Sequence, residues 1–313
     1  MKLAGWAVLL CALPAHAYQR TQTSDGVCMW WPAHGHSFQI DAQGTPDVAG
    51  TAAFDAIRRS FATWAAVSCS NLAFPEEPLS TSESDRVVGY FGGRPNHNLV
   101  LFRTRSCRDV PAADPCHAQH ACSNLYDCWE FGDSTIATTT TTANARTGEI
   151  LDADIELNDA PAANGTKFTF TAIDGLPCGN DPNATDCVRT DVQNTVTHEA
   201  GHSLGLDHVP NHPEATMYPS SAPGEITKRV LAADDIQGIC AIYPRGAASV
   251  TCVPPGSNGG CGCSHGQTGP GAAFAALLLL LQISRRSRRR PQLAMSSRSR
   301  AATSPRFQSG SEN

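Results

Sequence analysis

The clearest hydrophobic pattern along the chain lies in residues 52–67. Phe54, Ile57, Phe61 and Trp64 recur at spacings of three and four, so a helix through this segment has one apolar face. A surface helix buries such a face, and we therefore predict that this helix packs on a sheet. Its aromatic side chains are expected to belong to the core and not to a ligand site.

Other segments alternate between apolar and polar residues or are rich in β-branched residues, and they predict strands. The predicted strands are residues 36–40, 87–91, 99–102, 135–142 and 149–158. The last two are joined by a short segment that ends in Gly148, which favours a hairpin. A final helix is predicted over residues 231–243, where Asp234 and Asp235 stand near its positive end.

The motif T-V-T-H-E-A-G-H-S-L-G-L-D-H carries the strongest chemical signal. On a helix, His198 and His202 share one face, where both imidazoles can bind a single metal ion with Glu199 beside it. Gly205 can take a positive φ at no steric cost, which lets the chain turn back so that His208 supplies a third nitrogen. Three neutral ligands leave a fourth position on Zn²⁺ for water, whose pKa the ion lowers to about 7.

The longer pattern H-E-x-x-H-x-x-G-x-x-H, followed by Met217 in A-T-M-Y-P, resembles the active site of metzincin metallopeptidases. The matrixin branch is the most similar, because Tyr218 follows Met217 directly. The resemblance extends to the helix at 52–67 and to L-x-x-D-D-I-x-G-I-x-x-x-Y at 231–243, and spans roughly residues 26–245. It implies an α/β (α+β) fold with a twisted, mostly parallel sheet, an antiparallel edge strand, an active-site helix and a Met-turn.

Carried over position by position, the resemblance makes His198, His202 and His208 the ligands of one catalytic zinc ion. Glu199 would be the general base and Met217 the floor below the ligands. The implied activity is that of a zinc metalloendopeptidase, with a protein or peptide as substrate.

The predicted hairpin resembles the matrixin edge strand over which the substrate lies extended. Unpaired backbone groups at such an edge bind a peptide by strand addition. The residues expected to do so are Ile150, Leu151, Asp152 and Ala153.

Acidic and amide side chains alternate along the same predicted strand at Asp152, Asp154, Glu156 and Asn158. Glu156 stands where vertebrate matrixins carry a structural-zinc histidine, so a second zinc ion of that kind is not expected. Two interpretations remain open: a calcium site with oxygen ligands, or a solvated acidic edge that resists aggregation, and we favour the second.

The chain has 13 cysteines, which in an exported protein indicates disulfides. Plausible pairs are Cys178 with Cys187, Cys240 with Cys252, and Cys28 with Cys69. Four further cysteines, accompanied by two histidines, lie in an insertion near residues 104–132. We favour two disulfides there over a second zinc site. These residues are Cys107, Cys116, Cys122, Cys128, His117 and His120.

Both ends of the chain are expected to lie outside the domain at residues 18–245. Residues 1–17 read as a secretory signal peptide, because a lysine and an apolar run precede Ala-His-Ala. Residues 246–270 are predicted to be a Gly/Pro/Cys linker. Residues 271–290 combine a short apolar segment with an arginine cluster, and residues 291–313 are expected to be a disordered tail.

The apolar segment in residues 271–290 falls short of the roughly 20 residues that span a bilayer. With its arginines it resembles the C-terminal sorting tags of myxobacterial surface proteins. We therefore expect transient membrane attachment, processing near Cys261 or Cys263, and a secreted or outer-surface location.

Charge separates the body of the chain from its tail. Residues 18–284 contain 14 of the 23 basic and 28 of the 29 acidic residues, a net charge of −14, whereas the whole chain has −6. An acidic body does not suit nucleic acids, and we expect a monomer without a nucleic-acid partner. Two rival functions are a catalytically silent surface protein that keeps the zinc fold for binding, and a disulfide-rich adhesin in which the motif is accidental.

Overall fold

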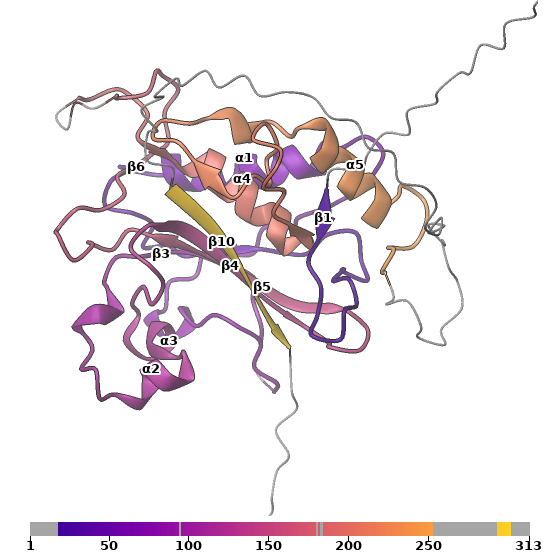
Figure 1. Cartoon of the computed structure of the whole chain (residues 1–313), viewed down its shortest axis with the longest axis horizontal. Helices are drawn as coiled ribbons and strands as arrows, with labels where there is room; N and C mark the ends of the chain where they lie inside the picture. Colours follow the sequence, from indigo (N-terminus) through magenta and orange to yellow (C-terminus); the bar gives the residue numbers. More distant parts are fainter. Residues whose placement is uncertain (1–17, 94, 180, 182–183, 253–292, 302–313) are drawn as a thin grey trace, which may run out of the picture.

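The computed structural model describes residues 18–93, 95–179, 181, 184–252 and 293–301 (Figure 1). The predicted signal peptide, most of the linker, and the apolar segment with its arginines lie outside these residues. The helices are α1 (Ala52–Ala65), α2 (Pro115–Gln119), α3 (Cys122–Tyr126), α4 (Val192–Ser203) and α5 (Ala233–Ile242), with 3-10 turns at Glu83–Asp85, Cys107–Asp109 and Thr227–Arg229. The strands are β1 (Gln19–Arg20), β2 (Gln39–Ile40), β3 (Leu99–Arg103), β4 (Thr135–Ala143), β5 (Ile150–Asn158), β6 (Phe170–Thr171), β7 (Thr190–Asp191), β8 (Leu206–Asp207), β9 (Ser220–Ser221) and β10 (Leu293–Ala301).

The main sheet has the strand order β2-β3-β5-β4-β10-β9. β2, β3 and β5 run parallel, and β4 pairs antiparallel with β5 as the predicted hairpin. The predicted α/β fold with a mostly parallel sheet is therefore confirmed. β10 runs parallel to β4 and antiparallel to β9, so a strand lies where we expected a disordered tail.

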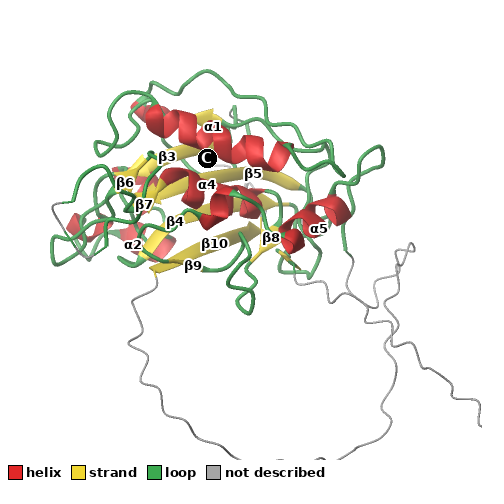
Figure 2. Cartoon of the chain, turned by 90° about the horizontal axis from the view of Figure 1, so that it is seen from above, coloured by secondary structure: helices red, strands yellow, loops and turns green. Residues whose placement is uncertain are grey.

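Helices α1 and α4 pack together on one face of the sheet, and α2 and α3 lie on the opposite side (Figures 1 and 2). The predicted apolar face of α1 is buried at Ile57, Phe61 and Trp64, whereas Phe54 lies at its half-buried margin. The indole N–H of Trp64 donates to the carbonyl of Thr197 at 2.9 Å, which ties α1 to α4. Among the described residues, no helix has the length and apolar character needed to cross a membrane.

The predicted strand at residues 87–91 does not form. Val88 is buried against Leu99 and Leu101, but its backbone pairs with a side chain and not with another strand. The amide of Asn124 accepts from the N–H of Val88 at 2.9 Å and donates to its carbonyl at 2.8 Å. Gly89 follows at a φ of +95°, which ends any extended segment.

A network of buried charges joins the Cys-rich insertion to the sheet. Arg103 on β3 donates to Glu156 on β5 at 2.7 Å and to Asp127 in the insertion at 2.6 Å. Arg86 pairs with the same Asp127 and with Asp41. The side chains of both arginines are at most 1 % exposed, so each charge is balanced by carboxylates of the protein and not by water.

Five disulfides form among the described residues. Cys178–Cys187 is confirmed, and the insertion holds Cys107–Cys128 and Cys116–Cys122, as favoured over a second zinc site. The other two expected pairs, Cys240 with Cys252 and Cys28 with Cys69, are wrong. The reason is that α5 lies beside the end of α1, and the segment after α5 returns to the N-terminal segment. The pairs formed there are Cys69–Cys240 and Cys28–Cys252.

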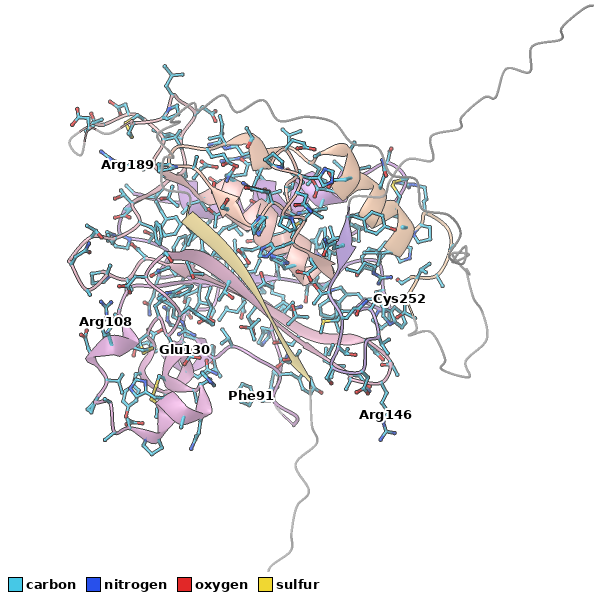
Figure 3. The ribbon with its side chains drawn as sticks, viewed as in Figure 1. Phe91, Arg108, Glu130, Arg146, Arg189 and Cys252 are labelled. Carbon is cyan, nitrogen blue, oxygen red and sulfur yellow. A yellow bond between two sulfur atoms is a disulfide. The ribbon has the colours of Figure 1, made fainter. Side chains whose placement is uncertain are left out.

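The domain extends beyond residue 245, where we placed the start of a linker. The N–H of Val250 donates to the carbonyl of Ile242 at 2.7 Å, and Arg20 donates to the carbonyl of Val250 at 2.7 Å. Cys252 then lies near the N-terminal segment to which its disulfide joins it (Figure 3). Residues 246–252 therefore belong to the folded body.

Candidate metal centre and catalytic site

Helix α4 is fixed at its first turn by Asp191. Its carboxylate caps the helix by accepting from the N–H of Asn194 at 2.7 Å. The same carboxylate receives two hydrogen bonds from Arg229, at 2.8 Å and 2.6 Å. Asn194 in turn accepts from the N–H of Lys228 at 2.8 Å. The start of α4 is thus locked to the segment that follows the predicted Met-turn.

The structure brings the three predicted histidines together. The Nε2 atoms of His198, His202 and His208 form a triangle with edges of 3.2, 3.2 and 3.1 Å. Nitrogens about 2.0–2.1 Å from a tetrahedral zinc ion stand about 3.3 Å apart, so the triangle fits such an ion. The three side chains form one of the groups suited to holding a metal among the described residues.

The other ring nitrogens set the orientation of two of these imidazoles. Nδ1 of His198 lies 2.6 Å from the carbonyl oxygen of Thr216, and Nδ1 of His202 lies 2.9 Å from that of Leu206. A carbonyl accepts only from N–H, so the proton is on Nδ1 and the Nε2 lone pair faces the centre of the triangle.

Burial keeps the three imidazoles neutral, as ligation requires. It lowers the pKa of His202 to about 3, with a further contribution from His208. Burial also lowers the pKa of His198 well below its ordinary value and lowers that of His208.

Two glycines of the motif are required by their surroundings. Gly205 has a φ of +87°, as predicted for the turn that brings His208 back. A Cβ on Gly201 would stand 2.3 Å from the sulfur of Met217 and 2.9 Å from the ring of Trp64. Met217 is 2 % exposed and therefore packs directly under α4, where a floor was expected.

Glu199 is completely buried beside the histidines. Its Oε2 accepts from the hydroxyl of Thr139 on β4 at 2.7 Å, while Oε1 has no hydrogen-bond partner among the described residues. Burial raises the pKa of Glu199 to about 8, against the opposing effect of the Thr139 hydrogen bond. A cation held by the histidines would favour the carboxylate form.

Asp235 supports the site in a way that the sequence did not reveal. Its carboxylate accepts from the N–H groups of Thr216 at 2.8 Å and Met217 at 3.2 Å. Thr216 is the residue whose carbonyl orients His198, so Asp235 positions a ligand through one intermediate residue. From the sequence, Asp235 was interpreted only as an acid near the start of a helix.

The strand residues expected to bind substrate are not at the edge. Ile150, Leu151, Asp152 and Ala153 belong to β5, which lies between β3 and β4. β4 lies one strand further out and carries Thr139, the partner of Glu199. In the hairpin, β4 is therefore the strand nearer the metal centre, and its other side pairs with β10.

The solvated acidic edge favoured for β5 is wrong. The side chains of Asp152, Asp154, Glu156 and Asn158 are all at most 2 % exposed. Glu156 pairs with Arg103, and the amide of Asn158 donates to the carbonyl of Thr135. Asp154 accepts from two backbone N–H groups. Asp152 accepts from Asn96, and its other oxygen has no hydrogen-bond partner in the described part of the chain.

The second candidate metal group is Cys116, His117 and Cys122. Its two sulfurs are joined in a disulfide, so neither is a thiolate that could ligate zinc. His117 is exposed and faces the carbonyl of Val110 at 3.4 Å. We therefore interpret this group as part of a structural disulfide and not as a metal site.

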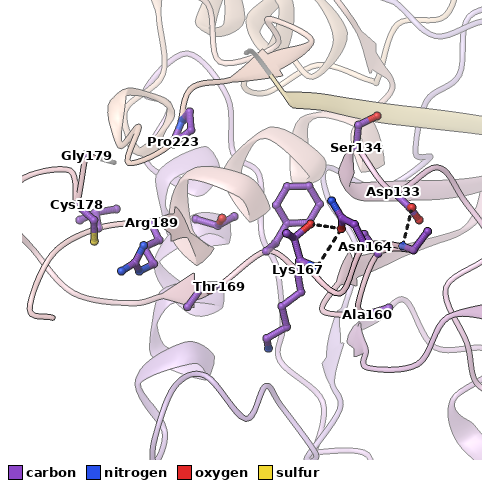
Figure 4. Close-up of a pocket in the computed structure, with 16 residues that line it drawn as sticks. Asp133, Ser134, Ala160, Asn164, Lys167, Thr169, Cys178, Gly179, Arg189 and Pro223 are labelled. Carbon is purple, nitrogen blue, oxygen red and sulfur yellow. Dashed lines mark hydrogen bonds between the residues drawn. The ribbon is translucent and has the colours of Figure 1, made fainter. Parts of the chain in front are cut away.

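A cavity of about 550 Å³ lies apart from the metal centre (Figure 4). Its lining comes from Asp133 and Ser134, from residues between 160 and 169, and from both ends of the disulfide loop, at 178–179 and 188–190. None of the three histidines lines it. A smaller pocket beside Thr195 of α4 shares Arg189, Thr190 and Pro223 with it, so the cavity adjoins the helix that carries the histidines.

Comparison with known proteins agrees with this geometry. The matrixin family, peptidase family M10, matches residues 30–244. A segment of 48 residues is 46% identical to macrophage metalloelastase of Oryctolagus cuniculus and covers 15% of this chain and 10% of that protein. Over 48 residues the chain is also 46% identical to human matrilysin, covering 15% of this chain and 18% of that relative.

Proposed function

The chain belongs to the matrixin family of zinc metalloproteases, and we propose that it is an exported zinc endopeptidase in which Glu199 is the general base. The observation that carries the proposal is the convergence of the Nε2 atoms of His198, His202 and His208 beside a buried carboxylate. The matched segments span only 10% and 18% of the two relatives, so the endopeptidase activity, the substrate and the location belong to the proposal.

The three histidines would hold one zinc ion. When bound, zinc is a Lewis acid that lowers the pKa of water and polarises a carbonyl group. Glu199 supplies the proton transfers: Oε1 is available to accept a proton from water and to pass it to the leaving amine, while Thr139 fixes Oε2. Because the carboxylate is fully buried, bulk water does not compete for it.

A peptide substrate would lie along β4. This strand carries the partner of Glu199, and the side on which β10 pairs with it could bind an extended chain through its backbone groups when β10 is absent. The segment after Met217 is held to the start of α4, because Asn194 donates to the hydroxyl of Ser221 and Asp191 accepts from Arg229.

The test compares the zinc-loaded chain with its Glu199→Gln variant on a mixed pool of unfolded peptides. Gln keeps the shape and the acceptor for Thr139 but cannot take a proton. We expect at least a 100-fold loss of cleavage with unchanged zinc content. Equal cleavage by both proteins would contradict the proposal. So would no cleavage by a folded, zinc-loaded parent in which β10 no longer pairs with β4, and either result would favour a silent binding role.

Export is proposed from the sequence of residues 1–17 and is consistent with the five disulfides formed among the described residues. The check is to locate the protein in its own cells after fractionation and to determine its N-terminal residue. A cytoplasmic protein that begins at Met1 would contradict it.

A further inference from the structure

A segment distant in sequence fills the space between the two walls of the proposed substrate cleft. β10 lies between β4 and β9 in the main sheet (Figure 2). At one end, Ala294 is paired with Thr135 of β4 on one side and with Ser220 of β9 on the other. An extended peptide can therefore add to β4 only where β10 is absent.

The register places β10 next to the catalytic carboxylate. Ser297 is paired with Thr139, whose hydroxyl holds Glu199. Pairing continues to Ala301 opposite Ala143, so β10 covers β4 from its first residue to its last.

The chain that joins β10 to the body strengthens this occupancy. Cys252 is anchored by its disulfide, and about 40 residues separate it from Leu293. Because β10 is joined covalently to the body, its pairing with β4 is intramolecular, whereas a peptide substrate has to bind from solution. Opposite charge also favours the binding of β10 to the body, because β10 contains two arginines and no acid whereas the body has a net charge of −14.

We propose that Leu293–Ala301 is an internal occupant of the substrate cleft that keeps the enzyme latent until the chain is cut between Cys252 and Leu293. The latency rests on the proposed peptidase function, whereas the occupancy of β4 does not. Such a cut breaks one backbone amide by hydrolysis, ends the tether and leaves β10 to dissociate as a separate peptide.

The experiment uses the full chain and a Ser296→Pro/Ser297→Pro variant. Successive N–H groups of a strand point to opposite neighbours, so the double change removes a donor to β4 whichever residue supplies it. The matched control is Ser309→Pro/Ser311→Pro, which makes the same substitutions beyond β10. All three are also made with Glu199→Ala, so that hydrogen exchange is measured without self-cleavage.

In the Glu199→Ala proteins we expect faster amide exchange across residues 135–143 for the β10 variant than for the parent and the control. With Glu199 intact, the β10 variant should cleave a peptide pool at least tenfold faster. Equal exchange in all three proteins would overturn the occupancy, and equal cleavage rates would overturn the latency. Cleavage within residues 293–301 of the parent would also overturn it, since β10 would then be a substrate.

These outcomes separate the two proposals. Faster exchange in the β10 variant, with no cleavage by the parent or by that variant, would support the placement of β10. It would contradict the peptidase function and therefore also the latency. Cleavage by the parent with no difference in exchange would support the peptidase and overturn this inference alone.

Discussion

The carboxylate of Asp235 accepts a hydrogen bond from the backbone N–H of Thr216 at 2.8 Å. It thereby links the first turn of α5 to the carbonyl that orients His198. Groups that orient metal ligands typically contribute 10- to 100-fold to metal affinity. Asp235→Ala should weaken zinc binding by that factor, measured by competition with a chromogenic chelator.

The neighbouring Asp234→Ala variant is the matched control for this positioning residue. Asp235→Asn keeps one acceptor and should give an intermediate affinity. Identical zinc affinities for Asp235→Ala and Asp234→Ala would show that Asp235 stabilises only the fold.

The buried pair of Arg103 and Glu156 predicts a large and specific loss of stability. Arg103→Met leaves Glu156 charged and unpaired in the core and should cost about 3–5 kcal/mol in urea unfolding. Adding Glu156→Leu removes that charge and should recover much of the loss. Arg58→Ala, which breaks pairs at the surface, should cost less than about 1 kcal/mol. A double variant as unstable as the single one would show that the guanidinium acts through Asp127 instead.

Asp152 predicts an unusual dependence of stability on pH. Burial raises its pKa to about 6 in the folded protein, above the value of about 3.9 in an unfolded chain. Between these values the folded state binds more protons, so the free energy of unfolding falls as pH rises from about 4 to 6. Asp152→Asn should be less sensitive to pH in this window and more stable than the parent at pH 8.

Thermal unfolding at pH 4 and pH 8 measures this difference, and a constant gap between the two proteins would contradict the assignment. The same variant tests the calcium interpretation of β5. Calcium that raises the unfolding temperature of the parent at pH 8, but not that of Asp152→Asn, would identify Asp152 as a ligand.

The pairing of cysteines gives a direct check of the tertiary structure. Peptide mapping without reduction should recover Cys28–Cys252 and Cys69–Cys240. Replacing Cys28 and Cys252 by serine opens a loop of 224 residues and should cost about 2–5 kcal/mol. Recovery of Cys240 joined to Cys252 would contradict the position of the segment after α5.

Local chemistry determined much of this protein from the sequence alone. The spacing of His198 and His202, the turn at Gly205 and the apolar face of α1 depend on neighbours within one or two helical turns. Such relations follow from helix periodicity and steric rules, so helices α1, α4 and α5, the β4–β5 hairpin and the grouping of the histidines were predictable.

Only the tertiary structure decided the rest. The sequence predicted both strands of the hairpin but not which one lies nearer the metal centre, since strand order depends on partners distant in the chain. The acids of β5 became buried because Arg103 and backbone N–H groups met them there. Cysteine pairs, the role of Asp235 and the place of β10 likewise depend on contacts between residues far apart in the chain, which spacing along a sequence does not encode.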